Sequence, residues 1–295
     1  SRRRVGEQAI KVTLFLAAVL SIVTTSLIVL SLMRETIVFF QDVPFSEYFG
    51  GTDWSPLFKP ASFGVLPLIV GTFLITAIAL VVAIPLGLGS AIYLSEYASP
   101  RVRRALKPAL EILAGVPTIV FGFFALTFFT PEILQALFGS EIKIYNAAAG
   151  GILVGFMVIP TIASVAEDAM SAVPGSLREG SSGLGASKFQ TSVRVVFPAA
   201  LSGIVAAVVL GASRAIGETM IVLIAAGQIA SMSLDPGAPH YTMTSFIAAT
   251  GKGDIPTGST AYKTIFAVGT TLFVITLLLN MITIRFVRKY RQVYE

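Results

Sequence analysis

The chain has 295 residues and a net charge of +5; 55% of its residues are hydrophobic and only 13% are charged. A soluble domain carries about 25% charged residues, and several apolar runs exceed the roughly 18 residues that indicate a membrane span. The composition therefore predicts an all-α, polytopic membrane protein. The chain contains no cysteine and one histidine, His240, which excludes thiol chemistry, disulfides and a Cys/His zinc site.

The positive net charge does not indicate nucleic-acid binding. A nucleic-acid-binding protein gathers its basic residues in a patch on a soluble domain, whereas here they lie in short clusters between apolar runs. Such clusters report the orientation of membrane helices, because Lys and Arg are enriched in cytoplasmic segments. We therefore expect a lipid bilayer, and no nucleic acid, around this chain.

Six apolar runs predict six transmembrane helices. They lie at 10–33, 66–94, 109–130, 146–166, 198–228 and 263–285. The first run is too long for the apolar region of a signal peptide, and no clear small-residue cleavage site follows it. We expect one helical domain with three sections: a first helix with an extended outer loop at 1–65, a core of five spans at 66–285, and a basic tail at 286–295.

The Lys and Arg residues determine the expected orientation. Six spans place both termini on one side. That side's segments carry fifteen Lys and Arg residues, whereas the segments of the other side carry five. The positive-inside rule assigns the richer side to the cytoplasm. We therefore expect both termini, and the loop between the fourth and fifth spans, in the cytoplasm.

Two outer segments have a distinctive composition. Trp54 and several phenylalanines in 34–65 allow two interpretations: aromatic anchors at the bilayer interface, which is their usual role at this level, or a surface for an outside partner. The segment 229–262 is polar and rich in Gly, Pro, Ser and Thr. We expect His240 to be a solvated loop residue there.

The cytoplasmic segment 171–198 is too polar to span the membrane and contains its own helix signals. Ser176–Glu179 forms an S-x-x-E capping box and Ser187–Gln190 an S-x-x-Q box, and such boxes start helices. Gly183 and Gly185 lie between them, and glycine readily adopts the left-handed conformation that ends a helix. We expect two short helices joined at a Gly-Leu-Gly corner, as a compact projecting element.

No nucleotide-binding pattern accompanies this loop. A P-loop needs G-x-x-x-x-G-K-[ST], and "ATGKGD" at 249–254 lacks the first glycine. We therefore expect no cofactor, no metal and no catalytic residue on this chain. If ATP drives the protein, a partner ATPase would bind the ATP and Mg²⁺.

The stretch "GASRAIGETM" at 211–220 places Arg214 and Glu218 inside the apolar fifth run. Insertion scales assign about 2.5–3.5 kcal/mol to each such charge at the membrane centre. On a continuous helix the i, i+4 spacing would let the two side chains pair. Two interpretations are open: a buried structural ion pair, or an anion pathway in which the Arg214 guanidinium binds oxyanions and Glu218 balances its charge. Ser213 and Thr219 are further candidates for that pathway.

The cytoplasmic loop resembles the EAA loop of bacterial ABC-importer permeases, in which Glu-Ala-Ala precedes a Gly and an Ile-x-Leu-Pro at fixed spacing. Glu179 and Gly185 match this spacing, and "VVFP" at 195–198 matches its end. In that family the loop forms a helix that couples the permease to the ATP-hydrolysing subunit. The resemblance implies these coupling residues: Ser176, Arg178, Glu179, Gly180, Ser181 and Gly185.

The stretch around Arg214 resembles the fifth span of the permeases of bacterial phosphate importers, and "RAIGETM" is typical of their PstC-type chains. The stretches at 84–98 and 111–125 resemble their second and third spans. The resemblance covers most of 65–285. It implies a permease of the type I ABC-importer architecture, located in the bacterial inner membrane.

The same resemblance implies a set of partners. They are a PstA-type permease as the other half of the pathway, two PstB-type ATPase subunits, a PstS-type phosphate-binding protein, and phosphate as the transported ion. Three alternatives stay open: an importer of another oxyanion such as molybdate or sulfate, an ATP-independent anion transporter or channel, and a membrane enzyme. The capped loop disfavours the second, and the third lacks a convergent set of nucleophile, base or metal ligands.

Overall fold

The computed structural model describes residues 2–253 and 255–290. Within these ranges the fold is helical apart from one isolated β-bridge, between Trp54 and Phe63. Five helices are long and apolar enough to cross a membrane: Ile10–Asp42, Leu66–Tyr97, Thr118–Phe138, Ala147–Ser171 and Thr260–Val287. A sixth span is present if Lys188–Ala199 and Leu201–Ile216, which are bent by 74° at their junction, form one broken crossing. The predicted all-α, multi-pass fold is confirmed.

Most helices follow one another in the chain with short connections, and the two long connections are 51–65 and 226–242. Their bounds are α1 (Arg2–Asp42), α2 (Phe45–Gly50), α3 (Leu66–Ile92), η1 (Tyr93–Tyr97), α4 (Pro100–Ala114), α5 (Thr118–Phe124), η2 (Ala125–Leu134), α6 (Gln135–Phe138), η3 (Gly139–Glu141), α7 (Ala147–Ser171), α8 (Gly175–Gly183), α9 (Lys188–Thr191), η4 (Ser192–Val196), α10 (Phe197–Ala199), α11 (Leu201–Ile216), α12 (Met220–Ala225), α13 (Met243–Gly251) and α14 (Thr260–Tyr290).

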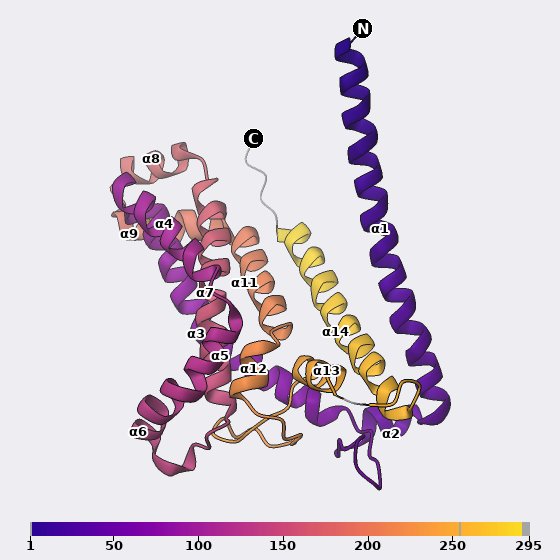
Figure 1. Ribbon diagram of the computed structural model, residues 1–295. Coiled ribbons are helices and arrows are strands. Elements are labelled where there is room, and N and C mark those ends of the chain that lie inside the picture. Colours follow the sequence, from indigo (N-terminus) through magenta and orange to yellow (C-terminus); the bar gives the residue numbers. More distant parts are fainter. Residues whose placement is uncertain (1, 254, 291–295) are drawn as a thin grey trace.

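The bundle has two ends, which carry different elements. The N-terminal end of α1 and the C-terminal end of α14 lie at the same end as α8 and α9, whereas α2, α6 and α13 lie at the opposite end (Figure 1). We call these ends the α8 side and the α13 side. The arrangement agrees with an even number of crossings, since both ends of the described chain lie on the α8 side.

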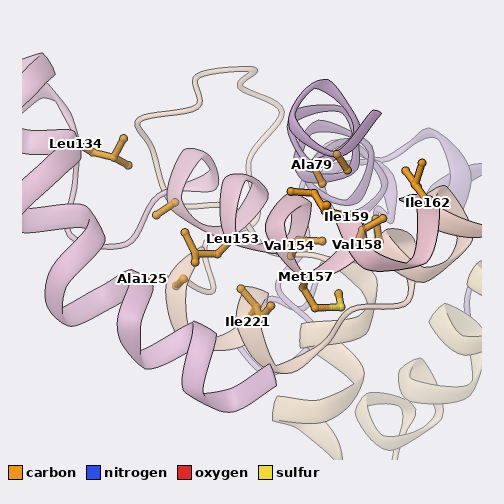
Figure 2. Packing of buried hydrophobic residues seen from close by; sticks show 14 residues of the cluster. Ala79, Ala125, Leu134, Leu153, Val154, Met157, Val158, Ile159, Ile162 and Ile221 are labelled. Carbon is orange, nitrogen blue, oxygen red and sulfur yellow. The ribbon is translucent and has the colours of Figure 1, made fainter. Parts of the chain in front are cut away.

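The core forms where α7 packs against its neighbours α3 and α11. Its largest buried cluster is built mainly from α7, with contributions from α3, η2 and α12 (Figure 2). Glycines set the close approach: a Cβ on Gly155 would lie 2.8 Å from the Ala79 carbonyl oxygen of α3, and one on Gly211 would lie 2.8 Å from Ile162 of α7. Small residues at such contacts let membrane helices approach closely.

Two of the predicted spans, each of which was expected to be one continuous helix, are broken. The run 109–130 crosses the end of α4 at Ala114, and a new helix starts only at Thr118, after Gly115 and Pro117. The run 198–228 crosses a second break, because α11 ends at Ile216 and α12 begins at Met220. In both places a glycine is the C-cap of the first helix; glycine is a poor helix former.

The first and last helices are longer than predicted. α1 extends to Asp42 because Phe39 and Val43 at its end belong to a buried cluster on the α13 side. α14 continues to Tyr290, so the first half of the predicted basic tail 286–295 is helical. Residues 291–295 of that tail lie outside the described residues.

Some aromatic residues of the outer segment build a core on the α13 side, whereas Phe45, Phe49 and Phe58 are exposed. Trp54 is only 7% exposed and packs edge-on against Tyr48 and Phe246. Trp54 is therefore a core residue. It acts neither as the predicted anchor at the bilayer interface nor as part of the predicted docking surface. The expectation for His240 is also wrong: the side chain is fully buried, with its ring nitrogens near the carbonyl oxygens of Ala238 and Ser233 at 3.1 and 2.8 Å.

Candidate functional site

Arg214 lies near the C-terminal end of α11 and is exposed on the surface of the chain. Its Nε is 3.1 Å from the sulfur of Met157, a buried residue near the middle of α7. A thioether is a weak acceptor, so this contact positions the guanidinium without neutralising it. The structure thus places a full positive charge at the depth of the middle of a spanning helix, on a face that nothing in the described chain covers.

Glu218 does not lie on the same helix as Arg214. α11 ends at Ile216, and Glu218 is in the break before α12. Its Oε1 accepts the backbone N–H groups of Met220 and Ile221 at 3.0 and 3.2 Å, and the side chain is 9% exposed. The predicted i, i+4 pairing is therefore wrong, because the helix that would align the two side chains stops between them. The carboxylate instead satisfies backbone donors at the start of α12, which carry partial positive charge.

The break is tied to the α13 side of the molecule. The hydroxyl of Thr244 in α13 donates to the Glu218 carbonyl oxygen at 2.7 Å. Thr219 Oγ1 donates to the Gly217 carbonyl oxygen at 3.2 Å, within the break itself. Ser213 and Thr219 were predicted as further pathway residues. Of these two, Thr219 contributes to the turn between α11 and α12.

Ser213 forms a hydrogen bond to the last span that the sequence did not predict. Its Oγ donates to Oδ1 of Asn280 in α14 at 3.4 Å. Because Ser213 precedes Arg214, this bond brings an exposed amide of the last span to the level of the guanidinium. A side-chain amide within the run 263–285 was the available signal, but the sequence does not show which helix it meets.

The loop after α7 contains the two short helices that were predicted, α8 and α9. Gly185 between them has φ +81°, the left-handed conformation expected there. The Ser187–Gln190 capping box forms, with both of its hydrogen bonds present. The Ser176–Glu179 box does not form, because α8 begins two residues earlier than that box requires, at Gly175, and Pro174 takes the N-cap position.

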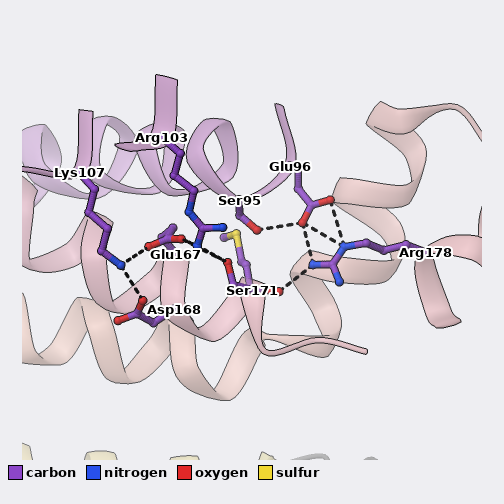
Figure 3. Close-up of polar contacts among 9 residues, drawn as sticks. Ser95, Glu96, Arg103, Lys107, Glu167, Asp168, Ser171 and Arg178 are labelled. Atoms are coloured by element: carbon purple, nitrogen blue, oxygen red, sulfur yellow. Dashed lines mark hydrogen bonds and ion pairs between the residues drawn. The ribbon is translucent and has the colours of Figure 1, made fainter. Parts of the chain in front are cut away.

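Arg178 faces inward and fastens this loop to its own chain (Figure 3). Its Nη2 lies 2.9 Å from the Glu96 carboxylate at the end of η1, and its guanidinium donates to the carbonyl oxygens of Met170 and Val173 at 2.8 and 2.6 Å. Ser181 is 2.9 Å from the Thr191 hydroxyl. Both residues therefore position α8, whereas the other predicted coupling residues are exposed: Ser176, Glu179, Gly180 and Gly185.

A second ionic cluster joins α4 to α7 on the α8 side (Figure 3). Arg103 and Lys107 both contact the carboxylate of Glu167, which is fully buried, and Lys107 also contacts Asp168 at 3.0 Å. Arg103 further donates to the Ser171 hydroxyl at 3.1 Å. The sequence placed these cations among the basic cytoplasmic residues but gave no sign of their acidic partners 60 or more residues away.

The tip of the loop exposes apolar side chains. Leu184 is 91% exposed and Phe189 is 67% exposed. They lie on either side of the Gly185 corner in the chain. Within 2–253 and 255–290, no group of three or more His, Asp and Glu residues is placed to hold a metal ion. The tip therefore presents large apolar side chains that nothing in the described chain covers.

Comparison with known proteins places the chain among transport proteins. Residues 83–292 match the family model described as "Binding-protein-dependent transport system inner membrane component". The chain is 36% identical over 247 residues to the probable ABC transporter permease protein YqgH of Bacillus subtilis, covering 84% of this chain and 79% of the relative. It is 34% identical over 279 residues to the phosphate transport system permease protein PstC 1 of Mycobacterium tuberculosis, covering 82% of each.

Solved structures share the fold at low sequence identity. A subunit of the MetNI methionine ABC transporter, in an inward-facing conformation, superimposes with a TM-score of 0.58 at 20% identity, covering 78% of this chain and 95% of that chain. A chain of a bacterial alginate ABC transporter superimposes with a TM-score of 0.59 at 14% identity, covering 92% and 98%. The helices described above therefore have the arrangement found in type I ABC importers.

Proposed function

We propose that this chain imports inorganic phosphate as one permease subunit of an ATP-driven complex. The chain belongs to the family of binding-protein-dependent transport system inner membrane components, together with the PstC permeases. The membership makes it a subunit of the translocation pathway of an ABC importer. Phosphate as the transported ion is our inference from the names of its relatives and from the chemistry of Arg214.

The exposed guanidinium of Arg214 is the observation that carries this proposal. A charge at the membrane centre costs about 2.5–3.5 kcal/mol on insertion scales, so it is not expected to face lipid. Met157 does not neutralise it, and Glu218 is engaged at the start of α12. An aqueous pathway between two subunits satisfies the guanidinium, whose planar donors match the oxygens of an oxyanion.

A second permease subunit would close this pathway. The face of α11 that carries Arg214 also exposes Leu210 and Gly217. We propose that a PstA-type permease covers it, so that the anion passes between the two chains with Arg214, Ser213 and the Gly217–Thr219 break on this side. Glu218 would then act on the pathway by holding the start of α12, because its carboxylate caps that helix.

ATP hydrolysis would take place on two PstB-type ATPase subunits that bind ATP and Mg²⁺. The exposed tip with Leu184, Phe189 and Glu179 offers them a docking element, and the inward contacts of Arg178 would pass a movement of α8 to η1 and α7. This arrangement places the α8 side and both termini in the cytoplasm, as the basic residues predict. A PstS-type binding protein would deliver phosphate on the α13 side.

Two rival functions differ from the proposal in different features, one in the transported ion and the other in the need for an ATPase. An importer of molybdate or sulfate would use the same guanidinium, because Arg binds tetrahedral oxyanions of either kind. An anion channel would not need the projecting loop with its apolar tip. The names of the sequence relatives favour phosphate, and the inward-fastened loop favours coupling to an ATPase.

The test is reconstitution of the chain with the products of neighbouring genes in liposomes. We expect ATP hydrolysis to rise when phosphate-loaded binding protein is present, and labelled phosphate to enter only with ATP. Sulfate and molybdate in tenfold excess serve as competitors. Uptake without ATP would support a channel, and uptake of sulfate or molybdate in preference to phosphate would contradict the assigned substrate.

A further inference from the structure

The last span, α14, carries several polar side chains, and the threonines within its membrane-spanning part are satisfied within the chain. Thr271, Thr276 and Thr283 each donate to the carbonyl oxygen four residues earlier, at 2.9, 3.0 and 2.7 Å. Thr270 lies 2.7 Å from the hydroxyl of Thr36 in α1. A Thr hydroxyl that bonds to its own helix is tolerated in lipid, because no donor is left without a partner.

Asn280 differs from these threonines. It is exposed, and within residues 2–253 and 255–290 its amide makes one hydrogen bond, in which Oδ1 accepts from Ser213. The amide has two N–H donors, and neither has an acceptor in the described chain. Burying such donors without a partner is costly in an apolar environment. Asn280 therefore requires an acceptor that this chain does not supply.

The position of Asn280 indicates which acceptor that is. α11 packs between α7 and α14 (Figure 1). Ser213 on α11 meets α14, and the next residue, Arg214, contacts α7 while its side chain is exposed. The amide and the guanidinium therefore reach the same level of the membrane from neighbouring helices.

We propose that Asn280 is a second ligand of the transported oxyanion, which rests on the proposed function of Arg214. Ser213 occupies Oδ1, so the N–H groups of the amide are left as neutral donors for the pathway. Donors of this kind add hydrogen bonds to an oxyanion without adding charge. They allow the site to select the ion while a single full charge keeps its release possible. Ser213 is a positioning residue in this arrangement, because it orients the amide.

The competing explanation is that the Ser213–Asn280 bond only joins two helices. In that case removal of either partner breaks the same bond, and the two variants behave alike. If Asn280 binds the anion, the variants differ, since Ser213→Ala leaves the amide donors in place whereas Asn280→Leu removes them. Comparison of these two variants therefore separates the roles.

The experiment measures anion uptake at varied concentration by the full complex in liposomes. We expect Asn280→Leu to lower kcat/KM for uptake about tenfold or more, the size of a lost hydrogen bond to a charged group. Ser213→Ala should lower it about threefold or less. Asn280→Gln, which keeps an amide one methylene further out, should fall between wild type and the Leu variant. Thr276→Val, about one turn away and bonded to its own helix, is the matched control and should transport like wild type.

Two results would overturn the proposal: uptake by Asn280→Leu equal to wild type, or equal losses in Asn280→Leu and Ser213→Ala. Recovery of the intact complex by size-exclusion chromatography shows whether each variant has assembled, and Asn280→Gln is used for the comparison if the Leu variant has not. If wild type transports another oxyanion in place of phosphate, the assigned substrate is wrong, and Asn280 is tested with that anion. A wild-type complex that transports no oxyanion would overturn both proposals.

Discussion

Two groups of polar side chains lie at different depths of the bundle and differ in how they are satisfied. On the α8 side, Glu167 is paired with Arg103 and Lys107, and Glu96 is paired with Arg178. Near the level of Met157, Arg214 has a sulfur as its neighbour, and Asn280 has one hydroxyl as its hydrogen-bond partner within residues 2–253 and 255–290. The first group completes its contacts inside this chain, whereas the second group is only partly satisfied.

The difference separates two roles for costly residues in a membrane protein. Buried ions that are paired stabilise one arrangement of helices, and loss of one partner leaves the other uncompensated. Ions and amides that stay exposed at membrane depth contribute little to the folded chain, and they are retained for a pathway or a partner. Substitutions of the paired ions should therefore lower stability more than transport, whereas substitutions of Arg214 and Asn280 should lower transport more than stability.

The largest effect on stability is expected when Glu167 loses both cations. Its side chain is fully buried, while Arg103 and Lys107 are 40% and 33% exposed, so the cost falls on the carboxylate that remains. We expect Arg103→Gln with Lys107→Gln to destabilise the chain by about 3–5 kcal/mol. Thermal unfolding in detergent, compared with wild type, measures this.

The matched control adds Glu167→Gln to the same double variant. The buried charge is then gone, and we expect most of the stability to return, because a buried ion pair can often be replaced by neutral groups at little cost. A triple variant no more stable than the double variant would show that packing of α4 on α7, and not the charge, holds this contact.

A smaller effect is expected for Arg178→Gln. The substitution leaves Glu96, which is 6% exposed, without its cation, and it frees the carbonyl oxygens of Met170 and Val173. We expect a loss of about 2 kcal/mol, in the range for removing one partner from a buried hydrogen bond to a charge, and a more mobile α8. A single cysteine at Ser182 would report this by faster labelling, against a background without cysteine.

Labelling at the same rate in the Arg178→Gln variant and in the parent would contradict the inward fastening of the loop. Glu179→Gln is the control for this measurement. Glu179 is exposed and lies next to Arg178, so its substitution should leave the labelling rate unchanged.

The spans were predictable from sequence because hydropathy depends on local composition, whereas the breaks were not. Gly211 and Gly217 both lie in the fifth apolar run, yet Gly211 packs against Ile162 within a continuous helix and Gly217 ends it. Which of these a glycine does depends on the neighbouring helix. The expected pairing of Arg214 with Glu218 failed for this reason, since it assumed a continuous helix.

The candidate site was predictable only where its signals are local. Gly185 and the Ser187–Gln190 box were found because their partners are three or fewer residues away. Asn280 was missed because its partner is 67 residues distant. The inward orientation of Arg178 was missed too, since Glu96 belongs to another helix.

An intermediate effect on stability is expected at Glu218. Its carboxylate accepts two backbone N–H groups at the start of α12, so Glu218→Ala should cost about 1 kcal/mol, as for a lost N-cap. Glu218→Gln keeps an oxygen acceptor and should cost less. Equal thermal stability of the Ala variant and wild type would show that the cap does not hold α12.

The smallest effect on stability, and the largest on transport, is expected for Arg214→Gln. The side chain is exposed, its one hydrogen bond within the described residues is to a weak acceptor, and Glu218 keeps its bonds to α12 when the guanidinium is removed. Surface substitutions of this kind usually change stability by less than about 0.5 kcal/mol. Uptake should nevertheless fall about a hundredfold or more, because in the proposed pathway the oxyanion loses the charge-assisted contact that Arg214 offers. Thermal unfolding and liposome uptake on the same preparation measure both quantities, with Arg178→Gln as the variant in which stability falls. A strongly destabilised Arg214→Gln would place Arg214 with the paired ions of the α8 side, and uptake near wild type would remove it from the pathway.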